Sequence, residues 1–210
     1  TTTCDALWMG VPVVSLTGEA FHQRISSIFL KDCGLDPLIC EDEAAYVRMA
    51  SELARHIHWS DTLMYDALAQ LPEAELTRER PSLFRNMLHT MNHMLVINHI
   101  WQCHLQGQAH DYTARNTPQY PPLDEMRQRH LALDQWYIDQ FEAWDETELM
   151  TDVAYELIGG QAGRMTRMQV LLHIAMHTHY HRGYVADMMF QVQGHRPPVM
   201  DLPVFVREHP

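Results

Sequence analysis

The chain has 210 residues, of which 46% are apolar, and its net charge is −12 with the histidines counted as neutral. This composition supports a buried core in one domain of ordinary size with a small addition. The acidic balance argues against partners that carry many phosphates, so we expect neither a nucleic-acid partner nor a membrane partner. No apolar run approaches the roughly 20 residues that a membrane-spanning helix needs.

Cysteine and histidine point to different kinds of site. None of the four cysteines belongs to a Cys-x-x-Cys pair, which argues against a disulfide scaffold or a thiolate zinc site and favours a reducing cytoplasm. The chain has 15 histidines, and imidazole is the commonest protein ligand for metal ions. One interpretation is that some of these histidines bind a metal ion, and the simpler one is that many of them lie at the surface. Their spacing along the chain decides between these two interpretations.

The first 40 residues have a pattern of their own. We expect a short helix at Asp5–Gly10, a buried strand at Val11–Gly18, a second helix near Ser26–Leu30 and a second strand at Leu38–Cys40. This order is a fragment of an α/β unit, and it has too few strands to form a stable sheet alone.

From about residue 41 the apolar residues recur at helical spacing. We expect a first helix over 41–71, stopped by Pro72, and a second over 81–106, with Pro81 in its first turn. Phe84 belongs to the apolar stripe of that second helix. The polar, proline-bearing stretch 107–122 is expected to be a loop.

The second half of the chain continues this pattern. We expect a third helix over 123–144, a hairpin or irregular connection over 152–167, and a fourth helix over 166–193. An extended tail starts at Pro197. Four long amphipathic helices with one long connection predict a mainly α fold, namely a four-helix bundle that follows a short α/β stub.

The fourth helix carries histidines at metal-ligand spacing. His173, His177 and His181 are four residues apart, so they share one helix face and two of them can converge on one ion. His179 lies about 200° away from that face and is not expected to be a ligand. A third ligand must come from another helix.

The second helix supplies several candidates for that third ligand. His89, His93 and His104 lie on one stripe, and His99 lies on the same helix. Each has the alternative interpretation of a core histidine held by hydrogen bonds, which we favour for His89 and His104, and for His173 on the fourth helix. Spacing alone leaves the ligand set open.

Residues from about 50 to 210 resemble the DinB-like family of bacterial metalloproteins. The stretches that carry the resemblance are Leu53–Trp59, Tyr65–Thr77, Thr90–Val96, Ile100–Trp101, Leu172–Gly183 and Pro197–Glu208. The resemblance implies two units, a fragment over 1–45 and a DinB-like four-helix bundle over 46–210, with homodimers as the expected assembly. A helix over 41–71 is expected to cross their junction.

The same resemblance selects the metal ligands. In that family one ligand follows an asparagine on the second helix and two lie in His-x-x-x-His-Arg-Gly on the fourth, which implies His93, His177 and His181 here. His89 and His173 then take supporting roles. Met176 departs from the asparagine that often precedes the first ligand of the fourth helix. That change removes a hydrogen bond around the ligands and leaves the ligands themselves intact.

Three imidazoles leave coordination positions open, as in catalytic rather than structural sites. Zinc or nickel is the expected ion, with iron or manganese as alternatives. Tyr180 and Tyr184 are expected to pack in the bundle, and Arg182 to form a structural ion pair.

The first 18 residues resemble the C-terminal lobe of the O-linked N-acetylglucosamine transferase family, and scattered matches continue to Tyr46. That resemblance places Thr1, Thr2 and Asp5 at the diphosphate and ribose of a sugar nucleotide. The sequence lacks the acceptor lobe and most of the donor lobe, so we expect this fragment to bind nothing.

The resemblance to the DinB-like family implies a hydrolase or a thiol S-transferase that uses the metal to activate a water or a low-molecular-weight thiol against a small-molecule substrate. No further general base stands out in the sequence, which slightly favours the thiol reaction. The alternatives are a non-catalytic metal-binding module of a stress response and, more remotely, the remnant of a glycosyltransferase.

Overall fold

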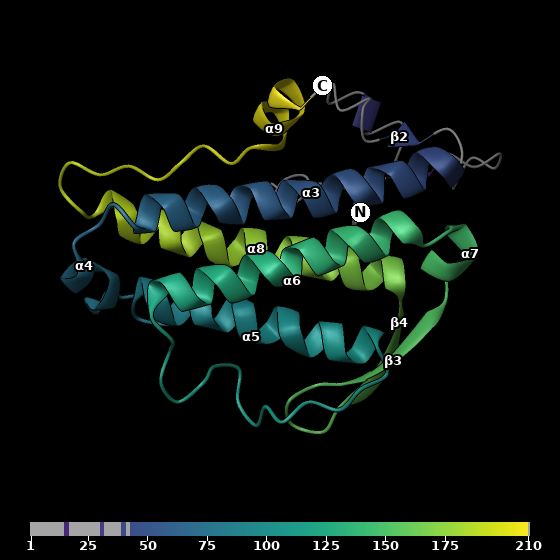
Figure 1. The fold of residues 1–210 in the computed structure, drawn as a ribbon, viewed down its shortest axis with the longest axis horizontal. Helices are drawn as coiled ribbons and strands as arrows, with labels where there is room; N and C mark the ends of the chain where they lie inside the picture. The colour runs from purple at the N-terminus through teal and green to yellow at the C-terminus, as the bar shows by residue number, and fades with distance from the viewer. Residues whose placement is uncertain (1–14, 17–29, 32–38, 41–42, 210) are drawn as a thin grey trace.

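The computed structural model describes residues 15–16, 30–31, 39–40 and 43–209. Four long helices lie side by side (Figure 1): α3 (Glu43–Leu68), α5 (Met87–Leu105), α6 (Leu123–Ala143) and α8 (Arg167–Phe190). Helix α3 packs mainly on α6, and α5 packs mainly on α8. The predicted mainly α fold, a four-helix bundle, is confirmed.

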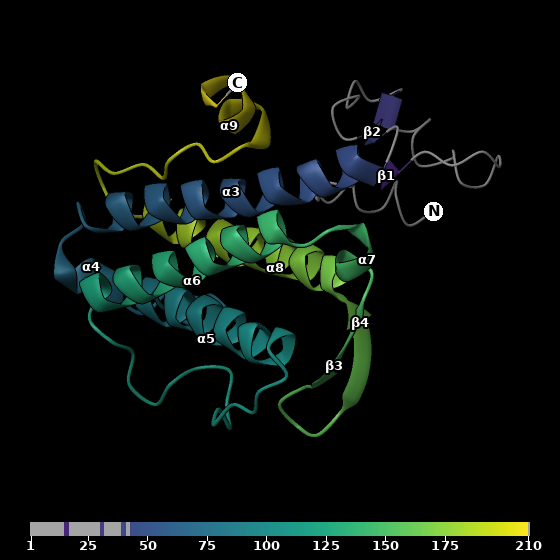
Figure 2. The same ribbon diagram turned by 45° about the vertical axis from the view of Figure 1, so that its right-hand side comes forward.

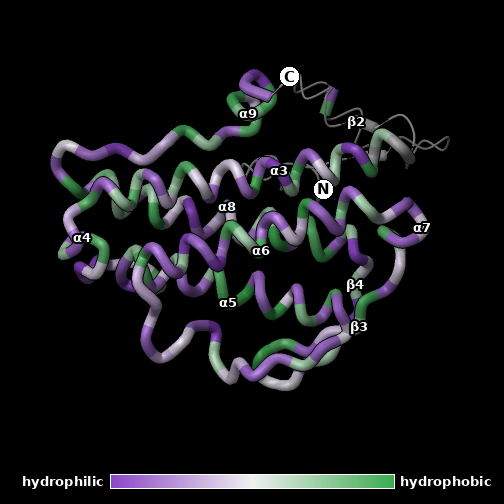
Figure 3. Tube along the Cα trace, in the orientation of Figure 1, coloured by the Kyte–Doolittle hydropathy of each residue, from purple (hydrophilic) through white to green (hydrophobic). Residues whose placement is uncertain are grey.

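The core lies between these four helices and is rich in methionine. Apolar side chains that recur every three or four residues face inward, whereas polar residues alternate with them along each helix (Figure 3). Fully buried members of the core include Met64, Met91, Met126, Phe141 and Leu171. Burial of these side chains supplies the main driving force for bundle formation.

The start of helix α5 differs from the sequence-based prediction. The helix begins at Met87 and not at Pro81, because Arg85 has a left-handed φ of 65° that no α-helix accommodates. Asn86 then caps the helix, and its side-chain oxygen accepts a hydrogen bond of 2.7 Å from the backbone N–H of His89. Phe84 therefore lies in the preceding loop, after a short helix α4 (Glu73–Thr77) that the sequence did not predict.

The connection into helix α8 is a β-hairpin, one of the two predicted alternatives. Strands β3 (Asp152–Glu156) and β4 (Ala162–Thr166) pair antiparallel and project from the end of the bundle (Figure 2). The turn between them needs Gly159 and Gly160, whose φ angles are 117° and 85°. Thr166 then closes a capping box at the first turn of α8.

Four shorter elements complete the described part of the fold. Strand β1 (Ser15–Leu16) pairs in parallel with β2 (Ile39–Cys40), within two of the predicted strands. Helices α7 (Glu146–Leu149) and α9 (Leu202–Glu208) were not predicted, and α9 follows the expected extended tail back onto α3 (Figure 1). Among the described residues, no helix is both long and apolar enough to cross a membrane.

Candidate metal centre

Helices α5 and α8 bring three histidines together inside the bundle. His93 lies midway along α5, and His177 and His181 lie one turn apart on the facing side of α8. One ring nitrogen of each residue lies within 4.8 Å of the other two, and the Nε2 atoms of His93 and His177 are 3.0 Å apart. His93 and His181 are buried, whereas His177 is half-buried. The three ligands implied by the family resemblance are therefore neighbours in space.

The orientation of the His93 ring is set by the loop between α5 and α6. Its Nδ1 atom lies 2.8 Å from the backbone carbonyl oxygen of Arg115. A carbonyl only accepts hydrogen bonds, so Nδ1 carries the proton and donates it, and Nε2 keeps its lone pair. Histidines that bind metals commonly donate their other ring N–H in this way. The Nε2 atom of His93 therefore faces the other two imidazoles without a proton, and its lone pair is available to bind a metal ion.

The residue before His93 holds that loop in place. The side-chain oxygen of Asn92 accepts hydrogen bonds from the backbone N–H and the hydroxyl of Thr117, at 3.0 and 3.1 Å. Asn116 adds a bond of 2.8 Å to the backbone oxygen of His89. This arrangement gives the Asn-His pair a physical role, because Asn92 fixes the loop whose Arg115 carbonyl orients His93.

Phe84 covers one side of the three histidines. Its ring stacks on the His93 imidazole with centroids 4.2 Å apart, and its centroid lies 5.5 Å from that of His181. This contact depends on the position of Phe84 in the loop before α5, which the helical pattern of the sequence did not predict. The aromatic ring therefore shields this side of His93 and His181 from water.

All three imidazoles are held in the neutral form that binds metals. Burial lowers the pKa of His177 to about 2, with a further contribution from the neighbouring imidazoles. Burial likewise lowers the pKa of His181 to about 4, and it lowers the pKa of His93 against the opposing effect of the Arg115 carbonyl. Each ring is therefore uncharged at neutral pH.

This donor set fits a divalent metal ion. Three neutral imidazoles from two facing helices match the nitrogen ligation of zinc, nickel, iron or manganese sites. The Nδ1 atoms of His177 and His181 are buried and have no hydrogen-bond partner among the described residues. The Met176 side chain is 45% exposed and gives His177 no such partner. Within the described part of the chain, His93 is thus the only one of the three whose outer ring nitrogen is fixed by a protein group.

The supporting histidines surround the cluster at a greater distance. The ring centroid of His173 lies 5.6 Å from that of His177, and the ring centroid of His89 lies 5.7 Å from that of Phe84. His104, on α5, instead packs against Trp101. His179 is exposed, as the helix-face argument predicted.

The other residues singled out on α8 divide into one confirmed prediction and one correction. Arg182 forms the expected structural ion pair, with its Nη1 atom 2.8 Å from Oδ1 of Asp61. Tyr180 was expected to pack in the bundle, but 55% of its surface is exposed because position 180 lies on the outer face of α8. Its hydroxyl contacts that of Tyr184 at 2.6 Å. Thr1, Thr2 and Asp5 lie outside the described residues.

Comparison with known proteins separates the two parts of the chain. Residues 1–77 match the model of glycosyl transferase family 41. Over 93 residues the chain is 32% identical to the probable UDP-N-acetylglucosamine–peptide N-acetylglucosaminyltransferases SPINDLY of Solanum lycopersicum and Petunia hybrida. The match covers 41% of this chain and 10% of the length of each relative. This chain thus spans about a tenth of the length of these relatives. The N-terminal segment is thus similar to a small part of such enzymes.

The larger part of the chain matches a different family. The crystal structure of a DinB-like protein from Bacillus cereus superimposes with a TM-score of 0.54 at 16% identity, over 69% of this chain and 91% of that one. At this identity the superposition shows a shared fold. The model of the DinB family matches residues 44–209, which include all four bundle helices except the first residue of α3. This chain therefore belongs to the DinB family.

Proposed function

We propose that the protein is a metal-dependent enzyme in which His93, His177 and His181 hold one divalent ion, zinc or nickel by preference. The observation that carries the proposal is the convergence of three neutral imidazoles, with the Nδ1 proton of His93 held by the Arg115 carbonyl. An ion bound by three imidazoles supplies Lewis-acid chemistry and lowers the pKa of a water or thiol that joins it.

Of the two reactions that the family resemblance implies, thiol transfer fits the surroundings better than hydrolysis. Among the described residues, no carboxylate forms a hydrogen bond or an ion pair with the three imidazoles. Helical zinc proteases, in contrast, place a glutamate beside the metal as general base. A thiol whose pKa is lowered is already a nucleophile, so its attack on an electrophile needs no such base.

The protein groups divide the remaining work between them. Phe84 covers one side of the cluster at His93, and His177 is the half-buried ligand. The exposed side chains of Met176 and Tyr180 lie beside His177 on α8. A small apolar electrophile approaching along this face would meet the cluster at its open side.

Metal binding and reactivity test the proposal in two steps. We expect the purified full chain to bind one Zn²⁺ or Ni²⁺ at this site, and His93→Ala and His177→Ala each to abolish that binding. His99→Ala is the matched control, because His99 lies on the same helix as His93 and contacts Tyr112 instead. Retention of the ion by both ligand variants would refute the three-histidine assignment.

The reaction is tested with Co²⁺ in place of the native ion. Addition of glutathione or cysteine should produce a sulfur-to-cobalt charge-transfer band, and the loaded protein should accelerate conjugation of the thiol to 1-chloro-2,4-dinitrobenzene. Accelerated hydrolysis of p-nitrophenyl acetate without any thiol effect would favour the hydrolase. An ion that responds to neither probe would support the non-catalytic metal-binding module.

A further inference from the structure

A second cluster of metal-ligating side chains lies in the core, on the other pair of bundle helices. Asp61 comes from α3, and His130 and Asp134 come from α6, one turn apart. Their side chains are between 0% and 1% exposed, and one ligand atom of each lies within 4.8 Å of the other two. The three-histidine site, by contrast, uses α5 and α8. This cluster is therefore a separate feature of the same bundle.

His130 is oriented in the same way as a metal ligand. Its Nδ1 atom lies 3.1 Å from the hydroxyl oxygen of Tyr65. Donation of the Nδ1 proton to that oxygen leaves a lone pair on Nε2, which lies 3.6 Å from Oδ2 of Asp61. The same division of ring nitrogens holds at His93, where the outer proton goes to the Arg115 carbonyl.

The two carboxylates have more acceptor atoms than the protein supplies donors. Oδ1 of Asp61 accepts a hydrogen bond of 2.8 Å from Arg182. Oδ2 of Asp61 and both side-chain oxygens of Asp134 are buried and have no donor among the described residues. The Nδ1 atom of His58 lies 4.0 Å from Oδ2 of Asp134, which is too far for a hydrogen bond. Because Arg182 neutralises only one carboxylate, the other calls for a cation of its own.

Asn98 on α5 closes the cluster and can add a fourth ligand. Its Nδ2 atom lies 3.2 Å from Nε2 of His130, while its Oδ1 atom is buried without a partner. A half turn of the side-chain amide exchanges these two atoms and places the amide oxygen beside Nε2 of His130. The hydroxyl of Tyr137 holds the backbone of Asn98 through a 2.6 Å bond to its carbonyl oxygen.

We propose that Asp61, His130 and Asp134 form a second metal site, which holds a divalent ion between α3 and α6. Two carboxylates and one imidazole form a set of donors that is richer in oxygen than the three histidines, and this set suits Mn²⁺ or Fe²⁺. Four-helix bundles build such sites from side chains on facing helices. Arg182 connects the two sites. It directly follows His181 of the three-histidine site in the sequence, and its side chain forms an ion pair with Asp61 of the second cluster.

The competing occupant is a single proton. Burial raises the pKa of Asp134 well above its usual range, and the neighbouring Asp61 adds to this effect, so a proton shared by the two carboxylates is the alternative to a metal ion. A metal ion binds the deprotonated carboxylates, so the ion and that proton cannot occupy the cluster together.

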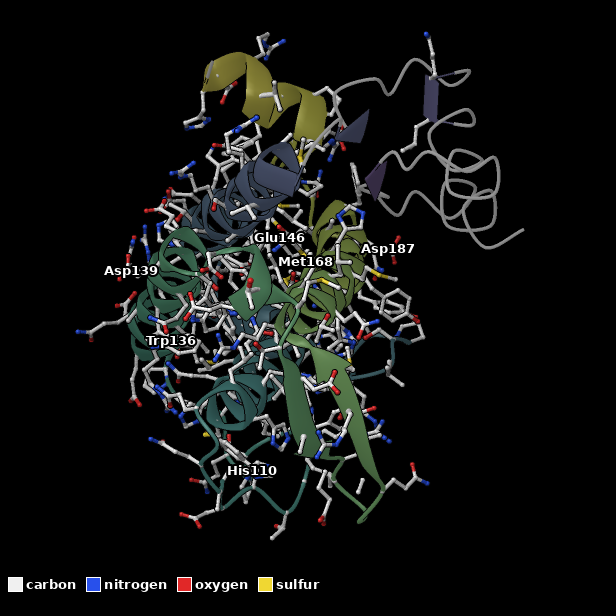
Figure 4. All side chains as sticks on the ribbon, turned by 90° about the vertical axis from the view of Figure 1, so that its right-hand side faces the viewer. His110, Trp136, Asp139, Glu146, Met168 and Asp187 are labelled. Atoms are coloured by element: carbon white, nitrogen blue, oxygen red, sulfur yellow. The ribbon has the colours of Figure 1, made fainter. Side chains whose placement is uncertain are left out.

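Metal counting in matched variants tests the proposal. The metal-free full chain is titrated with Mn²⁺ and its bound ion is followed by electron paramagnetic resonance. We expect His93→Ala to retain one tightly bound Mn²⁺ and the double variant His93→Ala/Asp134→Asn to lose that ion. Asp139→Asn is the control, because Asp139 lies on the outer side of the same helix (Figure 4) and should leave binding unchanged.

The outcomes distinguish this proposal from the three-histidine function. Asp134→Asn also removes the uncompensated charge, so the variant should fold, and His130→Gln repeats the test if it does not. Failure of His93→Ala to bind any Mn²⁺ would overturn the second site and assign the cluster to a shared proton. Loss of Zn²⁺ from His93→Ala, in contrast, bears only on the three-histidine site.

Discussion

The Nε2 atoms of His93 and His177 lie 3.0 Å apart, although 84 positions separate the two residues in the sequence. Two lone pairs at this distance repel unless a proton or a metal ion lies between them. Since the His93 ring donates its proton from Nδ1 to Arg115, this repulsion is relieved either by a proton on Nε2 of the neutral His177 ring or by a bound metal ion.

Asn92→Ala should weaken metal binding without touching a ligand. The substitution removes the acceptor that anchors Thr117, and with it the loop position of the Arg115 carbonyl. We expect an affinity loss of about 10- to 100-fold for Zn²⁺, the usual effect of losing a group that orients a ligand. Competition with a chromogenic chelator measures it. Gln106→Ala is the control, because Gln106 is exposed at the C-terminal end of α5. An Asn92→Ala affinity equal to that of the wild type would contradict the proposed role of the loop.

Phe84→Leu tests the aromatic cover of the cluster. Leucine keeps an apolar side chain in place but loses the stacking on His93, so the ring of His93 gains freedom. We expect about tenfold weaker Zn²⁺ binding with the stoichiometry of this site unchanged. Leu83→Ala is a suitable neighbour for comparison, because 63% of Leu83 is exposed. Equal affinities in the two variants would show that Phe84 has no part in the site.

Two glycine-to-alanine substitutions should change stability in opposite directions. A Cβ atom on Gly163 would lie 2.5 Å from the ring of Tyr155 on the paired strand, so Gly163→Ala should lower the free energy of unfolding by about 1–3 kcal/mol. A Cβ atom on Gly183, inside α8, meets nothing within 4 Å, so Gly183→Ala should raise it by up to about 1 kcal/mol. Urea denaturation compares both with the wild type, and equal effects would contradict the argument.

The metal-free protein should lose stability as the pH falls from 7.5 to 5.0. Burial lowers the pKa of His56 to about 4, whereas the unfolded chain titrates near 6.5, so the unfolded state binds more protons throughout this window. At pH 5, a buried histidine with a pKa of about 4 lowers the free energy of unfolding by at most about 2 kcal/mol. Urea midpoints at the two pH values measure the loss. His56→Gln should shrink it, and a midpoint independent of pH would show that these histidines are not buried in the neutral form.

The helices that carry the site were largely predictable, because their apolar residues repeat at the period of the α-helix. Helix α6, predicted over 123–144, spans Leu123–Ala143. The early start predicted for α5 was wrong because Pro81 is as compatible with a turn as with a first helical residue, and the left-handed Arg85 leaves no hydrophobic signature.

The second cluster could be predicted from the sequence only in part. His130 and Asp134 are spaced by four, a usable signal, yet nothing in the sequence indicates that Asp61 lies opposite them. For the three histidines, spacing supplied three candidates on α8. The family resemblance selected His177 and His181 among them, and His93 among four candidates on α5. Pairing between helices depends on packing, which local periodicity does not encode.

Helix α3 belongs to both of the family matches, since one covers residues 1–77 and the other residues 44–209. A truncation that removes residues 1–77, meant to delete only the transferase-like segment, would delete α3, which is one of the four bundle helices and the main packing partner of α6. A truncation before residue 43 would leave all four helices intact. The two family matches overlap over residues 44–77, whereas the chain can be divided before residue 43 with every bundle helix kept. The end of the transferase-like match is therefore not a place where the chain can be divided.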